Sequence, residues 1–200
     1  MFDSYPSVAR YWFDAWKGAY RAEDTMRFGR GYWIKTDGIS VDIWGSEKNT
    51  ITHSGLNGTS EPLGYGWNLV GAPSKSLSVA MIDQNPPNSL LTIFGWDVTK
   101  GYVVPTMVEP GRGYWVRVRN GTTLRMTGTN MQGGGSFETP YVQTVKEVNR
   151  IGWLEVSTAS GDRRYLSVSS DELTGEQKSA LRIPPVPASG ILDIRTGDMT

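Results

Sequence analysis

Few side chains in this sequence are of the kinds that carry catalysis or hold metal ions. His53 is the only histidine, and there is no cysteine, which excludes disulfides, thiol catalysis and thiolate metal sites. The polar stretch NTITHSGLNG predicts that His53 lies in a surface loop. A histidine–serine–aspartate triad is defined by geometry and stays open, but no G-x-S-x-G motif or zinc ligand set accompanies the histidine. We therefore expect no catalytic residue, no metal site and no cofactor.

Paired carboxylates are the remaining enzymatic option. Asp14 in FDAWKG and Asp97 in WDVTKG occupy matching positions. A glycosidase needs two carboxyl groups about 5–10 Å apart across a cleft. We expect instead that each aspartate accepts hydrogen bonds from its own turn before Lys-Gly. The DQN of Asp83–Asn85 carries one acidic residue, too little charge for a calcium site.

One glycine-aromatic phrase occurs twice. GRGYWIK at residues 29–35 returns as GRGYWVR at residues 111–117, 82 positions later (111 − 29). The phrase contains G-x-G but lacks the third glycine, the lysine–serine pair and the following helix of a phosphate loop. We interpret it as a building block, with glycines that permit a turn or bulge before a strand carrying two rings. Trp33 and Trp115 are then expected in core or semi-core positions with equivalent environments.

Composition narrows the partners. The 20 basic and 20 acidic residues give a formal net charge of zero, which argues against nucleic acid as a partner. No apolar run approaches the ~20 residues of a membrane span. MFDSYPSVAR is not a signal peptide, and Met1 is not expected to be the natural start of the module. Four arginines cluster locally and are interpreted as a solvated sheet face: Arg112, Arg117, Arg119 and Arg125.

The elements that must position these residues are strands. GYWVRVR alternates with a period of two, so Trp115 and Arg117 are expected on one face and Val116 on the other. Asn-Gly at 120–121 and Asp-Gly at 37–38 predict hairpin turns. Residues 7–45 and 89–128 correspond at an offset of 82–83. The sequence therefore predicts an all-β protein of antiparallel β-sandwich or barrel units, with an internal repeat of about 83 residues.

Three regions follow from this organisation. Residues 1–58 form an incomplete first repeat, residues 59–130 a second, complete repeat, and residues 131–200 a glycine-rich linker with a C-terminal β segment. Within the second repeat, LSVAMI is expected as a strand or one helical turn, and DQNPPNS as a loop. Within the last region, DELTGEQKSAL is the only convincing helical fragment, and a strand–turn–strand precedes it.

The order GWNLVGAPS, FGWDVTKGYVV and PGRGYWVRV resembles a repeat module of large exported or cell-surface proteins of gram-negative bacteria. In those proteins the module often lies ahead of a type IX secretion sorting domain. The tail after residue 163 is also similar, with an acidic stretch before a proline-proline segment. The resemblance covers about residues 60–200 and part of 7–45, although the first copy lacks the GWNL half. It implies an extracellular or cell-surface location and a modular architecture.

Tryptophans found in one copy only are the candidate ligand contacts. Three have no aromatic counterpart in the second copy, and two aspartates lie near them in sequence: Trp12, Trp16, Trp44, Asp14 and Asp42. Planar aromatic rings can stack on sugar faces, so a carbohydrate-binding module is one hypothesis. The favoured hypothesis is a non-catalytic structural or adhesive segment, with neighbouring domains of the same polypeptide as partners. A third is an accessory domain of a secreted hydrolase.

Overall fold

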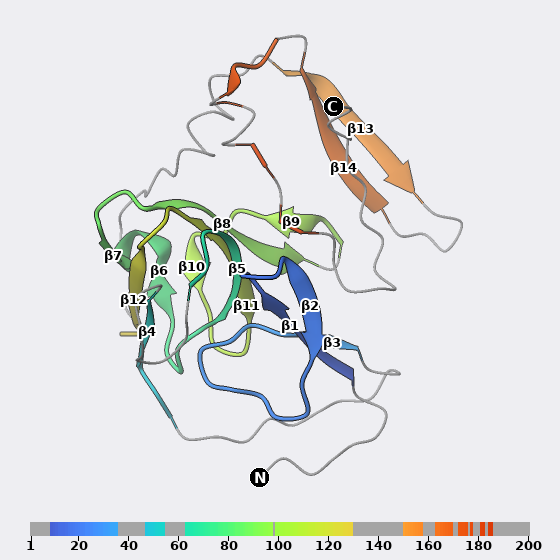
Figure 1. Ribbon diagram of the computed structural model, residues 1–200. Helices are drawn as coiled ribbons and strands as arrows, with labels where there is room; N and C mark the ends of the chain where they lie inside the picture. Colours follow the sequence, from blue (N-terminus) through green and yellow to red (C-terminus); the bar gives the residue numbers. More distant parts are fainter. Residues whose placement is uncertain are drawn as a thin grey trace.

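The protein is built almost entirely from antiparallel strands (Figure 1). The computed structural model describes residues 9–35, 47–54, 63–97, 99–129, 150–157 and 163–169, and single positions or short stretches between 172 and 185. The prediction of an all-β, sandwich-like fold is confirmed. The strands are β1 (Ala9–Asp14), β2 (Ala19–Ala22), β3 (Trp33–Lys35), β4 (Thr50–Ser54), β5 (Gly66–Gly71), β6 (Leu77–Ser78), β7 (Asp83–Asn85), β8 (Leu90–Asp97), β9 (Gly101–Val103), β10 (Met107–Val108), β11 (Gly113–Val118), β12 (Thr123–Thr127), β13 (Arg150–Ser157) and β14 (Arg163–Ser169).

A four-stranded sheet in the order β5-β11-β8-β9 forms the centre of the structure. One face packs against the three-stranded sheet β4-β12-β7 and the short pair β10-β6, and the other face contacts the sheet β2-β1-β3. The hairpin β13-β14, expected as strand–turn–strand, lies at one end of the molecule in Figure 1. β4 falls in the range assigned to the first repeat but pairs with β12 of the second. The three predicted regions otherwise stay a prediction.

Two apolar cores lie on opposite faces of the central sheet. The larger is aliphatic, is shared with the β4-β12-β7 side, and includes Ile93, Val116, Leu124 and Met126. The smaller core is aromatic and joins the central sheet to residues 9–35, which carry β1, β2 and β3 and are called the first segment below. Its buried members and the side chains packed on them are Phe13, Phe94, Trp115, Ala15, Tyr20, Trp67, Leu69 and Tyr102.

Strand β11 is buried on both faces. Val116 and Val118 point into the aliphatic core while Trp115 points into the aromatic one, so the predicted alternation is confirmed. Arg117, expected on a solvated face, is only 7% exposed, and burial lowers its pKa. The expectation failed because β11 is a central strand: Arg117 lies between Trp67 of β5 and Thr92 of β8, and Tyr65 and Arg182 lie near its guanidinium.

The prediction of a β-hairpin at Asn120 and Gly121 is wrong, because β11 and β12 do not pair with each other. β11 pairs with β5 and β8, whereas β12 pairs with β4 and β7, so the turn carries the chain between sheets. Gly121 has φ 73°, but Asn120 is not among the positive-φ residues of the described chain. A type I′ hairpin turn requires positive φ at both positions. With both edges of β11 already paired, the next strand has to join the other sheet.

Smaller elements also differ from expectation. Asp83–Asn85 forms β7, so the predicted loop is confined to residues 86–89. The stretch 77–82 is both a strand, β6, and a 3-10 helix over Val79–Met81. The helical fragment begins with a capping box, in which Gln177 N donates to Thr174 Oγ1 (3.2 Å) and Thr174 N donates to Gln177 Oε1 (2.9 Å).

The glycines of the first GRG phrase join the two halves of the structure. Gly31 N donates to Leu69 O (3.2 Å), and Gly71 N donates to Gly29 O (2.7 Å). This segment therefore adds to the free edge of β5, whose other edge pairs with β11. A Cβ at Gly31 would lie 2.7 Å from Val70 O, so no larger residue fits without a backbone shift.

We expect Gly31→Ala to lower the free energy of unfolding by roughly 1–3 kcal/mol, because the added methyl group overlaps a backbone carbonyl. Gly113→Ala is the matched control, since Gly113 is the counterpart in the second phrase and its Cβ would meet atoms no closer than 3.5 Å. Urea denaturation of both variants measures the difference. Equal destabilisation of the two would contradict the close approach at Gly31.

Candidate functional site

The same turn precedes the tyrosine in both GRGYW phrases. Arg30 N donates to Arg27 O (3.3 Å), and Arg112 N donates to Glu109 O (3.4 Å). The third residue of each turn is a glycine in the left-handed region, Gly29 with φ 88° and Gly111 with φ 74°. Positive φ at that position alone is the geometry of a type II turn. The first glycine of each phrase is therefore a turn residue, as the building-block interpretation predicts.

Each tyrosine of the phrase closes its own turn. Tyr32 Oη accepts from Arg27 N, and Tyr114 Oη accepts from Glu109 N, both at 2.9 Å. Burial raises the pKa of both phenols, to about 12 for Tyr32. Neither hydroxyl ionises near neutral pH, so their role is to hold the turn.

Strand pairing matches as well. Tyr11 lies opposite Trp33 between β1 and β3, and Phe94 lies opposite Trp115 between β8 and β11. These pairs are equivalent at the sequence offsets of 83 and 82. Residues 36–46 lie outside the described part of the chain, so the repeat over its full length stays a prediction.

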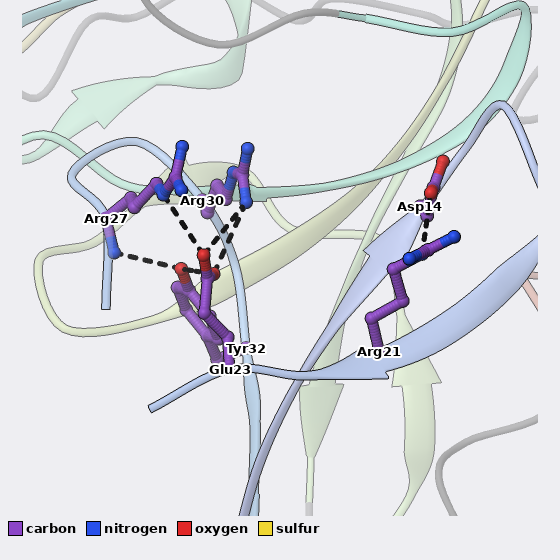
Figure 2. Close-up of polar contacts among 6 residues, drawn as sticks. All are labelled: Asp14, Arg21, Glu23, Arg27, Arg30 and Tyr32. Carbon is purple, nitrogen blue, oxygen red and sulfur yellow. Dashed lines mark hydrogen bonds and ion pairs between the residues drawn. The ribbon is translucent and has the colours of Figure 1, made fainter. Parts of the chain in front are cut away.

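A polar cluster on the first segment surrounds Glu23 (Figure 2). Its carboxylate accepts from Tyr32 Oη (2.8 Å) and forms ion pairs with Arg27 Nε (3.0 Å) and Arg30 Nη1 (3.3 Å). The Arg30 guanidinium also lies 4.1 Å from the centre of the Trp12 ring. The carboxylate thus has three donors and two cationic neighbours, which suits it to fixing the loop and not to accepting a proton from a substrate.

The predicted sugar-binding residues that the structure describes, Trp12, Trp16 and Asp14, have different surroundings, and the site stays a prediction. Trp12 is half-buried on β1 beneath Arg30, while Trp16 projects from the following turn with 68% of its surface exposed. Asp14 is 9% exposed and pairs with Arg21 Nε (2.8 Å, Figure 2). Trp44 and Asp42 lie outside the described residues.

Each aspartate of the Asp-x-x-Lys turns bonds its own turn, as predicted. Asp14 Oδ1 accepts from Lys17 N (3.2 Å). Asp97 Oδ1 accepts from Thr99 Oγ1 (2.6 Å), Thr99 N (2.8 Å) and Lys100 N (2.9 Å). The Thr99 hydroxyl and these amides hold the pKa of Asp97 at about 2. The two carboxylates act as turn caps.

The expectation for the repeated tryptophans is half right. Trp115 is 2% exposed, and its Nε1 has no hydrogen-bond partner among the described residues. Trp33 is half-buried, donates from Nε1 to Tyr20 Oη (3.1 Å), and packs edge-on against Trp96. Their environments therefore differ: one is core and the other semi-core.

His53 is not in a surface loop. It lies on β4 opposite Leu124, is 1% exposed, and its Nε2 has no partner among the described residues. Burial lowers its pKa to about 4. The alternation in TITHS, with Ile51 and His53 two positions apart, is the signal that sequence reasoning missed.

A cavity that the sequence did not reveal lies at the end of the β8–β11 ladder, next to the Phe94–Trp115 pair. Its volume is about 240 Å³. Both GRGYW phrases contribute, since Tyr32 and Trp33 line it along with Arg112 and Tyr114. The other lining residues are Leu69, Gly95, Trp96, Asp97, Val103, Pro105, Met107, Glu109, Gly113 and Trp115. Aromatic walls with a few charged groups at the rim are typical of a binding site.

No protein family model, curated protein or solved structure matches this chain. Among the described residues, no group of three histidine, cysteine, aspartate or glutamate side chains is placed to hold a metal ion. In the same part of the chain, no helix has the length and apolar character needed to cross a membrane.

We expect His53→Leu to remove a pH dependence of stability. The folded pKa of about 4 lies below the ordinary 6.5, so the unfolded chain binds the proton more tightly between these values. Stability from this group is complete above pH 6.5 and falls as the pH is lowered toward 4. Between pH 7 and pH 5, the free energy of unfolding measured in urea should fall by about 2 kcal/mol more in the parent than in the variant. Parallel losses would contradict the buried neutral histidine.

We expect Trp115→Ala to cost ~3–5 kcal/mol of unfolding free energy, because the ring is fully buried. Trp33→Ala should cost less, roughly 1–2 kcal/mol, since part of its surface already faces water. Thermal and urea unfolding of the two variants give the comparison. Equal costs would restore the expectation of equivalent environments.

Proposed function

We propose that this chain is a non-catalytic structural segment whose two related halves form one rigid body within a larger polypeptide. The observation that carries the proposal is the aromatic core between them. Phe13 lies edge-on to Trp115, with ring centroids 4.9 Å apart, and Tyr20 lies 6.3 Å from the same indole. Rings that fill the contact between two halves of a chain are committed to holding it together.

The charged groups support the same role. Glu23 is neutralised by Arg27 and Arg30, and Asp14 by Arg21. Such saturated pairs fix loop geometry and leave little capacity for acid–base chemistry at these positions. An extracellular or cell-surface location, with neighbouring domains of the same polypeptide as partners, rests on the sequence resemblance and is part of the proposal.

Carbohydrate binding is the second candidate, and Trp16 is the observation that favours it. Its indole is 68% exposed in a turn next to Asp14. An exposed ring beside a polar group can stack on a sugar face. The opposing point is that Trp12, the nearest predicted partner, is already stacked under Arg30.

Cooperative unfolding tests the structural role. We expect amide hydrogen exchange in β1 and β11 to slow to the same limiting rate, because the aromatic core makes the two strands open together. Trp115→Ala should accelerate exchange in both strands, whereas Trp16→Ala should accelerate it in neither. Loss of protection in β11 alone would show that the halves are independent domains.

Polysaccharide pull-down tests the second candidate. We expect each polysaccharide to retain the parent and Trp16→Ala to the same extent. The unfolding curve of each protein is the control for folding. Retention that depends on Trp16 would replace the structural proposal by the carbohydrate-binding one.

A further inference from the structure

The cavity at the end of the β8–β11 ladder is lined by residues that correspond to a packed cluster in the first segment. In the first segment a tryptophan side chain fills the corresponding space. There, continuing the β1–β3 register one position past the Tyr11–Trp33 pair sets Trp12 opposite Tyr32, and Arg30 covers the Trp12 ring at 4.1 Å. Continuing the β8–β11 register one position past the Phe94–Trp115 pair sets Gly95 opposite Tyr114 in the same way. The counterpart of Arg30 is Arg112.

Gly95 therefore has no side chain at the position where the first segment has the indole of Trp12. A Cβ at Gly95 would lie 3.4 Å from the Tyr114 ring, so a side chain can start there without overlap. Gly95 is not among the positive-φ glycines, so its backbone suits other residues. The cavity is lined by Gly95, Tyr114 and Arg112 together. It lies where an indole would lie if position 95 carried tryptophan, as position 12 does.

The size of the cavity fits one ring system. Its volume of about 240 Å³ exceeds the ~150 Å³ of an engineered cavity that binds benzene, and is below the ~300–1,000 Å³ of sites for drug-sized ligands. Trp33 and Trp96 supply aromatic edges to the wall.

The charges at the rim suit a neutral ring with one polar edge. The Arg112 guanidinium pairs with Glu109 at 3.1 Å, and its side chain is 62% exposed, so it is accessible to a ring below it. Glu109 and Asp97 also line the cavity and can accept a hydrogen bond from a ring N–H or O–H.

We propose that this cavity binds a planar aromatic ring of the indole type, held between the Tyr114–Gly95 surface and the Arg112 guanidinium. The occupant completes in the second segment the ring–arginine stack that Trp12 and Arg30 make in the first. The inference does not depend on the proposed structural role, because it rests on the register, the cavity and the arginine alone.

Titration with indole, followed by NMR shifts of the Trp33 and Trp96 indole N–H signals, tests the proposal. We expect saturable binding to the full chain with a Kd of about 0.1–10 mM. Arg112→Gln should weaken it roughly two- to fivefold, as loss of a cation–π contact predicts. Tyr65→Ala, an exposed aromatic residue outside the cavity, should leave it unchanged. Absence of saturable shifts in the parent, or saturation by glucose without saturation by indole, would overturn the proposal.

Two exchanges between the halves make the test specific. Gly95→Trp should fill the cavity, abolish indole binding and leave the melting temperature at or above that of the parent. Trp12→Gly should lower the melting temperature, and millimolar indole should raise it by more than it raises that of the parent, because the variant then has a second ring site under Arg30. Unchanged titration of a folded Gly95→Trp would overturn the assignment.

The source of the ring follows from a second ligand. N-acetyltryptophanamide carries the same ring on a blocked backbone. Its binding, competitive with indole, would support a tryptophan side chain of a polypeptide as the occupant. Binding of indole without binding of the amide would support a free aromatic compound at the same site.

Discussion

Strand β11 is the constraint on which the rest of the structure depends. Both of its edges are paired, by β5 and β8, and both of its faces are buried. A fully enclosed strand needs apolar cover on two sides, which one sandwich cannot supply. The aliphatic core covers Val116, and the first segment of the chain covers Trp115 with Phe13 and Tyr20. The exit of β12 into another sheet follows from the same saturation of edges.

Glycine makes the second cover possible. The contact between the halves is a backbone approach in which Gly31 and Gly71 exchange hydrogen bonds with the opposite segment. Side chains at these positions would meet carbonyl oxygens at 2.7 Å. The two GRG phrases thus share a turn but use their last glycine differently. In the first phrase it admits the edge of β5, while in the second it begins β11.

The two halves share a tyrosine-closed turn with an arginine, but they differ in what the arginine contacts. A tyrosine closes a type II turn in each, and an arginine follows that turn. In the first half the arginine is held by Glu23 and covers the Trp12 indole on β1. In the second half the strand carries Gly95, and a cavity occupies the region beside it. The two GRGYW phrases thus lie beside a ring–arginine contact in the first half and beside a cavity in the second.

Local features could be read from the sequence by itself. Period-two alternation located β11, and the Asp-x-x-Lys turns were assigned from residue type, because these depend only on neighbouring positions. Which face of a strand meets water is decided by distant segments. Arg117 and His53 are therefore buried against expectation, Trp33 and Trp115 differ, and the turn at Gly121 changes sheets. The cavity arises only at the end of the β8–β11 ladder beside Trp33, a juxtaposition of three segments that tertiary packing alone creates.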